Sequence, residues 1–354
     1  MVAIRVVDQV ASDVPQVAEA PGPTDRAEDR WLDIDRAKGF GIALVVWGHI
    51  ATGATPDSPD WFNLSIAAIY AFHMPFFMYL SGFVYFLIKA PDRFWTAPAG
   101  FVGKRFDRLI VPFLLFSLLV IIGKYAFSSF GRIDDDVQGI GDGMVQVLTN
   151  APGNPSLSTW YILVLFVYSV LTPLLWRVSG RRIWPLLLLG AIGWVWALPE
   201  DFYIRRIAQF YIFFVLGGAF AVHRERVLPI LQRFWLPLLI AFAVICALTL
   251  KTEYTLLVCG LACIPGLHGL FRQRFLDGDR LLLFLGRSSM AIYLLNTMGI
   301  GVAKLIYLHF LPYRGEWFVL YAGILFATGM IGPIVARWLI GRIPPLRPVA
   351  RYLD

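Results

Sequence analysis

Charged residues are scarce in this sequence. Asp, Glu, Lys and Arg make up 16% of its 354 residues, whereas hydrophobic types make up 58%. A soluble protein of ordinary composition has about 25% charged residues. The apolar residues are gathered in long runs, so the deficit indicates a lipid environment rather than a large soluble core. The sequence therefore predicts an integral membrane protein.

Other absences narrow the class further. The three cysteines lie within apolar runs and have no histidine at metal-ligand spacing, so we expect small buried hydrophobic side chains, no metal site and no disulfide framework. No glycine-rich phosphate loop occurs. Residues 1–30 lack the apolar core of a signal peptide, and their composition predicts a disordered cytoplasmic tail. Residues 31–354 are expected to form one membrane domain.

Ten apolar segments follow the predicted tail. Each is long enough to span a hydrocarbon core of about 30 Å at about 1.5 Å rise per residue. They lie at about 37–54, 62–88, 107–127, 159–177, 183–198, 206–222, 234–250, 254–271, 281–308 and 316–341. The sequence thus predicts an all-α, polytopic membrane helix bundle of about ten transmembrane helices.

Basic residues fall mainly in the loops after even-numbered segments, while the loops after odd-numbered segments are poorer in them and often acidic. The positive-inside rule then places both termini in the cytoplasm, and the net charge of +7 is a topology signal rather than a nucleic-acid patch. Arg205 and Arg206 are the main exception, because they fall at the outer face; they are either noise or a functional basic site. The outer loop at about 128–158 is the longest connection, and such loops are often lids or binding loops.

Two histidines lie deep in the first two segments. If the first helix begins near residue 37, His49 is about 18 Å from its start, and His73 is about 16 Å below the outer surface. Ionisable residues inside a membrane commonly mark functional sites, and imidazole can take a proton from a hydroxyl near neutral pH. The alternative is a pair of structural histidines bonded to neighbouring helices. Pro75 is expected to kink the second helix, and Ser81 permits close helix packing.

A pair of arginines opens the third segment. Arg105 and Arg108 are three residues apart, hence on one helical face. Such a face can hold a phosphate or pyrophosphate, or it can anchor the helix at lipid headgroups. Trp160 and Tyr161 begin the fourth segment, where an interfacial aromatic belt is expected.

Asn296 is a polar residue inside the ninth segment, where it is either a link between helices or a site residue. The other histidines, His223, His268 and His309, lie near segment ends. Solvent or lipid headgroups can satisfy them there, so we leave them out of the predicted site.

Four ordered blocks, residues 35–49, 73–82, 104–112 and 284–293, resemble acyltransferase family three proteins, and more narrowly the fucose 4-O-acetylase-like acetyltransferases. The family motif of a basic residue, ten residues and a histidine matches Lys38 and His49, with lysine in place of the usual arginine. Lysine keeps the charge but lacks the bidentate fork. The arginine pair of the family matches Arg105 and Arg108. Many relatives have a histidine near the position of Asn296.

The resemblance implies an enzyme of the cell inner membrane that moves acetyl or another short acyl group from cytoplasmic acetyl-CoA to a hydroxyl of a cell-surface or exported carbohydrate, such as an exopolysaccharide. His49 is expected to be the general base, and His73 to orient the acceptor or stabilise the oxyanion. Lys38, Arg105 and Arg108 are expected to hold the CoA phosphates. The expected supporting residues are Asp35, Ser81, Trp160, Tyr161 and Asn296. The expected chemistry is direct transfer without a metal.

The competing prediction is a transporter or flippase for a glycan or a lipid-linked sugar, since intramembrane histidines and a kinked helix suit that class too. The third prediction is a non-catalytic membrane sensor or scaffold. The sequence leaves open the acyl group, the sugar and its hydroxyl, and the oligomeric state, a homo-oligomer included.

Overall fold

The apolar runs form helices in the computed structural model, which describes residues 31–50, 58–127, 137–150, 153–156 and 159–353. Within these residues no β-strand occurs, although an isolated antiparallel bridge joins Asn150 and Asp201. The all-α prediction is confirmed. The predicted disordered tail, residues 1–30, lies outside the described residues. The chain divides into two compact units after Leu32, and the larger one, Asp33–Asp354, contains the membrane helices.

Six helical stretches are long and apolar enough to cross a membrane, judged on the described part of the chain. They are Asp60–Leu87, Pro98–Phe127, α10 (Trp160–Val178), α12 (Ile204–Val222), α17 (Ser289–Phe310) and α18 (Trp317–Arg342). A seventh span arises if α13 (Arg224–Arg233) and α14 (Trp235–Thr249) are taken together, although they are bent by 78° at a short break. Two shorter apolar helices are α11 (Ile183–Val195) and α15 (Thr255–Phe271). Within the described residues every predicted apolar segment is mainly helical, while the count of ten stays a prediction.

Two of the spans are interrupted. The first consists of α4 (Asp60–Tyr70) and α5 (His73–Leu87), and Pro75 explains the break between them. Proline has no N–H, so no helical bond can reach the carbonyl of Ala71, four residues earlier. The second consists of α7 (Pro98–Arg105), the π-helical turn η2 (Phe106–Ile110) and α8 (Val111–Phe127).

The remaining elements are short, apart from the first helix of the membrane domain. That helix, α3, covers Leu32–Gly48, and therefore begins about five residues earlier than the sequence predicts. The others are α6 (Ala90–Arg93), η1 (Phe94–Thr96), α9 (Ile140–Thr149), η3 (Arg274–Leu276), α16 (Arg280–Arg287), η4 (Pro344–Leu346), α19 (Arg347–Ala350) and η5 (Arg351–Leu353). Helix α9 lies within the region predicted as a long outer loop, so that region is partly helical.

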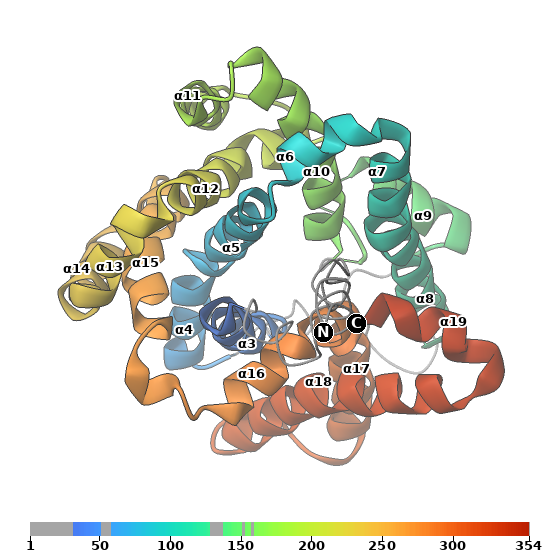
Figure 1. The fold of residues 1–354 in the computed structure, drawn as a ribbon. Coiled ribbons are helices and arrows are strands. Elements are labelled where there is room, and N and C mark those ends of the chain that lie inside the picture. The colour runs from blue at the N-terminus through green and yellow to red at the C-terminus, as the bar shows by residue number, and fades with distance from the viewer. Residues whose placement is uncertain (1–30, 51–57, 128–136, 151–152, 157–158, 354) are drawn as a thin grey trace, which may run out of the picture. The chain divides into compact units, whose positions relative to one another are not determined.

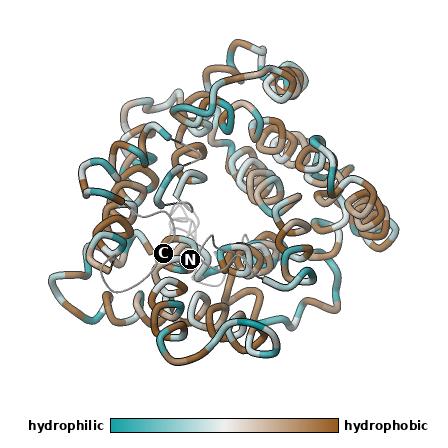
Figure 2. Tube along the Cα trace, turned by 180° about the vertical axis from the view of Figure 1, so that it is seen from behind, coloured by the Kyte–Doolittle hydropathy of each residue, from teal (hydrophilic) through white to brown (hydrophobic). Residues whose placement is uncertain are grey.

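Helix α14 shows why this chain needs an apolar solvent. Leu236, Ile240, Val244 and Leu248 recur at every fourth residue, and each is at least half exposed. Such a stripe in water would be a large unsatisfied apolar surface. Figure 2 shows hydrophobic residues predominating along the helices and hydrophilic ones in many of the connecting segments. The described chain is therefore built as a membrane protein.

Glycines set the closest helix contacts. In Figure 1, α5 lies beside α12 and α3 lies near α16. A Cβ atom at Gly82 of α5 would fall 1.8 Å from the carbonyl oxygen of Phe214 on α12. One at Gly39 of α3 would fall 2.1 Å from the carbonyl oxygen of Leu282, and one at Gly286 of α16 would fall 1.9 Å from that of Asp35. Only glycine allows these backbones to approach so closely.

Candidate functional site

His49 lies just beyond the last residue of α3, where its amide still donates to the carbonyl of Val45 at 3.0 Å. Its Nδ1 is 2.6 Å from Oδ1 of Asn296 in α17. The two residues are 247 positions apart in the chain. The structure therefore brings together a predicted base and a predicted supporting residue.

The amide of Asn296 is held in one orientation. Its Nδ2 donates to the carbonyls of Ile292 and Tyr293, each at 2.8 Å, and the side chain is fully buried. Flipping the amide would turn its oxygen toward those two acceptors. Because Oδ1 can only accept, Nδ1 of His49 carries the proton and Nε2 offers a lone pair. His49 is also partly exposed, so a hydroxyl can reach it.

His73 begins α5, directly after the break in the first span. Its Nδ1 donates to the carbonyl of Ile69 at 2.8 Å, which leaves the lone pair on Nε2. Tyr70 connects the two histidines: its hydroxyl donates to the carbonyl of Gly48 at 3.2 Å, and its ring meets the His73 ring edge-on at 5.1 Å between centroids. The two imidazoles lie within electrostatic range of each other. His73 is only 4% exposed, so His49 is the more accessible base.

Lys38 lies on the same face of α3 as His49, because eleven residues make about three helical turns and about 16 Å of rise. Its Nζ is 3.8 Å from Oδ1 of Asp35, which is buried. The approach of Gly39 and Gly286 holds this part of α3 against α16. The structure therefore places Lys38 and Asp35 together, about three helical turns of α3 away from His49.

Arg105 and Arg108 lie on different local structures. Arg105 ends α7, and its guanidinium lies over the rings of Tyr85 and Phe101 at 5.6 and 5.2 Å from their centroids. Arg108 is an exposed residue of the π-helical turn η2, and the two guanidinium groups interact electrostatically. π-Helical turns alter the regular spacing of a helical face and are frequent at functional sites.

Lys38 and Arg105 lie toward the same end of the bundle. The end of α3 meets the start of α5 at the two histidines, so these helices are antiparallel. Lys38 is near the start of α3, and Arg105 packs on Tyr85 near the end of α5. Both basic residues thus lie toward the end opposite the histidines.

A second polar group is linked to Asn296 through Tyr293. Ser81 Oγ and Tyr161 Oη form a hydrogen bond, and the Tyr161 ring lies 5.7 Å from that of Tyr293. Tyr293 also supplies one of the carbonyls that orient Asn296. This group is therefore connected to the His49–Asn296 pair.

Trp160 is 9% exposed, and the guanidinium of Arg206 lies over its indole at 4.9 Å. It is thus covered by protein rather than being an open interfacial residue. Arg205, in contrast, pairs with Glu200 at 2.8 Å. Of the two arginines that depart from the loop-charge pattern, only Arg206 joins the aromatic group at the start of α10.

Sequence reasoning missed one buried polar cluster, which we call the Asp33 cluster. Asp33 Oδ2 is 2.7 Å from Arg272 Nη1 and 3.6 Å from His268 Nε2, while Tyr79 hydrogen-bonds to His268 Nδ1. His268 is 1% exposed, so the expectation that solvent or headgroups satisfy it is wrong. The cluster joins α3, α5 and α15. Asp33 and Arg272 are 239 residues apart, and their pairing has no local signal.

The Asp33 cluster makes a stability prediction. Asp33→Asn leaves Arg272 and His268 without their carboxylate, and breaking a buried ion pair from one side costs about 3 kcal/mol or more. We expect a clearly lower unfolding temperature in detergent, measured by intrinsic fluorescence. The control is Glu225→Gln, whose exposed ion pair with Arg224 should contribute less than about 1 kcal/mol. Equal stability of Asp33→Asn and the wild type would contradict the prediction.

No group of three or more His, Cys, Asp or Glu side chains suited to a metal ion occurs in the described parts of the chain. The arrangement therefore offers acid–base chemistry from imidazole and anion binding by basic residues. A neutral histidine with a free Nε2, oriented from behind by an amide, is suited to remove a proton from a hydroxyl.

Comparison with known proteins relates this chain to acyltransferases and to nodulation proteins. A family model described as an acyltransferase domain matches residues 31–338. The nodulation protein NolL of Mesorhizobium japonicum is 29% identical over 196 residues, which cover 54% of this chain and 48% of that protein. NolL of Sinorhizobium fredii is 33% identical over 102 residues, covering 28% of this chain and 27% of that protein. The matched region thus spans about half or less of these relatives. No solved structure matches.

Proposed function

Because this chain belongs to acyltransferase family three, we propose that it is an integral membrane O-acyltransferase that moves acetyl, or another short acyl group, from acyl-CoA to a hydroxyl of a carbohydrate. The observation that carries the proposal is the His49–Asn296 pair, which leaves a partly exposed imidazole with its Nε2 free. The nodulation proteins named above add support, since they match part of the same membrane region.

The reaction needs one proton acceptor. His49 Nε2 removes the proton of the acceptor hydroxyl as its oxygen attacks the thioester carbonyl. The tetrahedral intermediate collapses as the carbon–sulfur bond breaks, and the CoA thiolate takes the proton back from the imidazolium. A thioester is already activated, so a base and correct positioning supply most of the required rate enhancement.

His73 is best placed to orient the acceptor. Its Nδ1–H is used by the Ile69 carbonyl, so its Nε2 accepts a hydrogen bond rather than donating one to an oxyanion. Of the two roles predicted from the sequence, orientation of the hydroxyl therefore fits the geometry better. Ser81 and Tyr161 provide further hydroxyl groups beside the same region.

We propose that the acyl-CoA phosphates bind Lys38, Arg105 and Arg108. Guanidinium groups bind phosphate oxygens in a bidentate manner, and Lys38 adds a point charge. The separation of about 16 Å between Lys38 and His49 is comparable with the length of an extended pantetheine arm. The thioester then reaches His49 while the nucleotide stays at the opposite end.

The loop charges support insertion in an inner membrane with both termini on the cytoplasmic side. Lys38 and Arg105 then face the compartment that contains acyl-CoA. The histidines lie in the outer half of the bilayer, where a carbohydrate on the outer side can approach. The acceptor proposed is an exopolysaccharide or another exported glycan.

Donor binding has a direct test. Acetyl-CoA at about 100 times its dissociation constant should stabilise the purified protein by about 2.7 kcal/mol, seen as a higher unfolding temperature. In Arg105→Ala, the loss of a charge-assisted contact should weaken binding about tenfold or more. The matched control is Arg226→Ala, an exposed arginine of α13. An equal thermal shift in all three proteins would contradict the phosphate role of Arg105.

The transporter alternative draws on the bent pair α13 and α14, since broken spans are frequent in transporters. The same titration separates the two functions. A protein that moves a glycan without acylating it would show no stabilisation by any acyl-CoA.

A further inference from the structure

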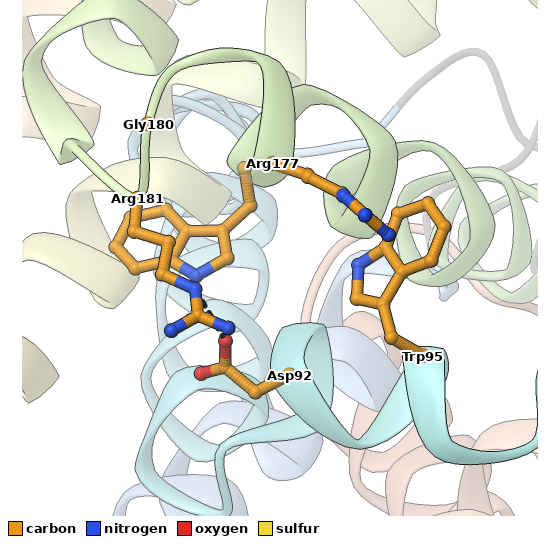
Figure 3. Close-up of a pocket in the computed structure, with 6 residues that line it drawn as sticks. Asp92, Trp95, Arg177, Gly180 and Arg181 are labelled. Carbon is orange, nitrogen blue, oxygen red and sulfur yellow. Dashed lines mark ion pairs between the residues drawn. The ribbon is translucent and has the colours of Figure 1, made fainter.

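A cavity of about 420 Å³ lies at the end of α10, away from the histidines. It is lined by Asp92, Trp95, Trp176, Arg177, Gly180 and Arg181. Figure 3 shows Arg181 reaching toward Asp92, while the side chain of Arg177 extends to the ring of Trp95. The residues come from α6, η1, the last turn of α10 and the turn that follows it, so the cavity is formed by two separate parts of the chain.

The cavity carries an excess of positive charge. Arg181 Nε is 3.3 Å from Asp92 Oδ1, so this pair is balanced. Arg177 lies over the Trp95 indole, with its Cζ 4.3 Å from the ring centroid. Among the residues that the structure describes, no carboxylate lies within 4.0 Å of Arg177. One guanidinium charge is therefore left for an anion.

The cavity also contains hydrogen-bond donors without acceptors. Within the described residues, the indole nitrogens of Trp95 and Trp176 have no hydrogen-bond partner. Asp92 Oδ1, an acceptor, makes no hydrogen bond there either, and its contact with Arg181 is an ion pair alone. Trp176 is 8% exposed. A buried N–H without an acceptor is unfavourable, and such a group calls for a specific explanation. A phosphate group would supply both the negative charge and several acceptor oxygens.

The turn after α10 directs Arg181 back across the cavity. Gly180 and Arg181 both have left-handed backbone conformations, at φ of 62° and 61°. This conformation is uncommon for a residue with a Cβ atom. The Arg181 amide donates to the Trp176 carbonyl at 2.8 Å, so an end carbonyl of α10 is satisfied and does not repel an anion.

A continuous aromatic line leads from this cavity to Arg105. The Trp95 ring lies 5.0 Å from that of Phe94, which lies 5.5 Å from that of Phe101. Phe101 in turn lies under the guanidinium of Arg105 at 5.2 Å. The cavity and the proposed donor arginine therefore belong to the same end of the bundle.

We propose that Arg177 and Arg181, together with the two indole N–H groups, form a second phosphate-binding site. Two sources share this chemistry: the nucleotide end of acyl-CoA, which carries a 3′-phosphate beside its diphosphate, and the headgroup of an anionic phospholipid. The nucleotide source rests on the proposed function, whereas the lipid source does not.

The test uses the purified full-length protein and two probes. One is adenosine 3′,5′-bisphosphate, measured by calorimetry in detergent. The other is dioleoylphosphatidylglycerol in nanodiscs, measured by native mass spectrometry. Arg177→Gln and Arg181→Gln should each lower the affinity for one of the two probes about tenfold. Arg181→Gln keeps the Arg177–Trp95 stack, so it remains informative if Arg177→Gln fails to fold. Arg182→Gln, the adjacent exposed arginine outside the cavity, should bind like the wild type.

Asp92→Asn gives an effect of the opposite sign. It removes the carboxylate that competes for Arg181 and should tighten binding of the same probe severalfold. Weakened bisphosphate binding assigns the site to the donor, and weakened lipid binding assigns it to a headgroup. Unchanged binding of both probes in the two arginine variants, or an equal loss in Arg182→Gln, overturns the proposal. If the wild type binds the lipid probe but no acyl-CoA, the proposed function fails and the lipid site stands.

Discussion

Replacing His49 by alanine is expected to lower the rate of acyl transfer by about 100- to 10,000-fold, the usual contribution of a general base. The reason is geometric: Asn296 fixes the imidazole so that Nε2 is the atom without a proton. No other described group offers a partly exposed, oriented nitrogen in this region, since His73 is buried. The rate is measured as labelled acetyl transferred per minute by the purified variant.

The control for this substitution is His223→Ala. His223 is exposed at the end of α12 and lies outside the proposed site. The His223→Ala protein should transfer acetyl at the wild-type rate. His49→Ala should still be stabilised by acetyl-CoA, because it keeps Lys38, Arg105 and Arg108. Near-normal turnover by a folded His49→Ala protein would remove His49 from the mechanism.

The second large effect concerns stability. Gly82→Ala places a methyl group 1.8 Å from the Phe214 carbonyl oxygen, and a Cβ atom added at Gly217 of α12 would fall 2.1 Å from the Tyr79 carbonyl oxygen. Neither backbone can move away without separating α5 from α12. We expect a loss of about 3 kcal/mol or more, seen as a lower unfolding temperature and a lower yield of monodisperse protein.

Gly123→Ala in α8 is the matched control, because its added methyl group would meet no atom of another element within 4 Å among the described residues. Alanine favours a helix over glycine by about 1 kcal/mol, so this variant should be as stable as the wild type or more stable. Equal unfolding temperatures of Gly82→Ala and Gly123→Ala would show that α5 and α12 pack less closely than described.

The helices could be predicted from the sequence because their signal is local. Every apolar run is mainly helical where the structure describes it, and Pro75 correctly marked the interruption of the first span. The break lies at Ala71–Phe72, however, before the proline, so His73 begins a helix instead of lying inside one. Helix α9 was missed because its sequence, rich in glycine and polar residues, is typical of a loop.

The site was only partly predictable, because its contacts join distant residues. The predicted distance of His49 from the start of its helix, about 18 Å, was too short, because α3 begins at Leu32 and the distance by helical rise is about 25 Å. The resemblance singled out Arg105 and Arg108. The hydrogen bond between His49 and Asn296 could not be predicted, since nothing local pairs residues from the first and ninth segments. The burial of His268 has the same origin: its partner Asp33 lies in the first helix.

The central claim is that this membrane bundle is itself the acyltransferase. It is tested most directly by incubating the purified protein with labelled acetyl-CoA and the carbohydrate fraction of a strain from which its gene is deleted. We expect a base-labile acetyl ester on the carbohydrate with the wild type, and none above background with His49→Ala. Absence of transfer by a folded, acetyl-CoA-binding wild-type protein, or equal transfer by both proteins, would contradict it.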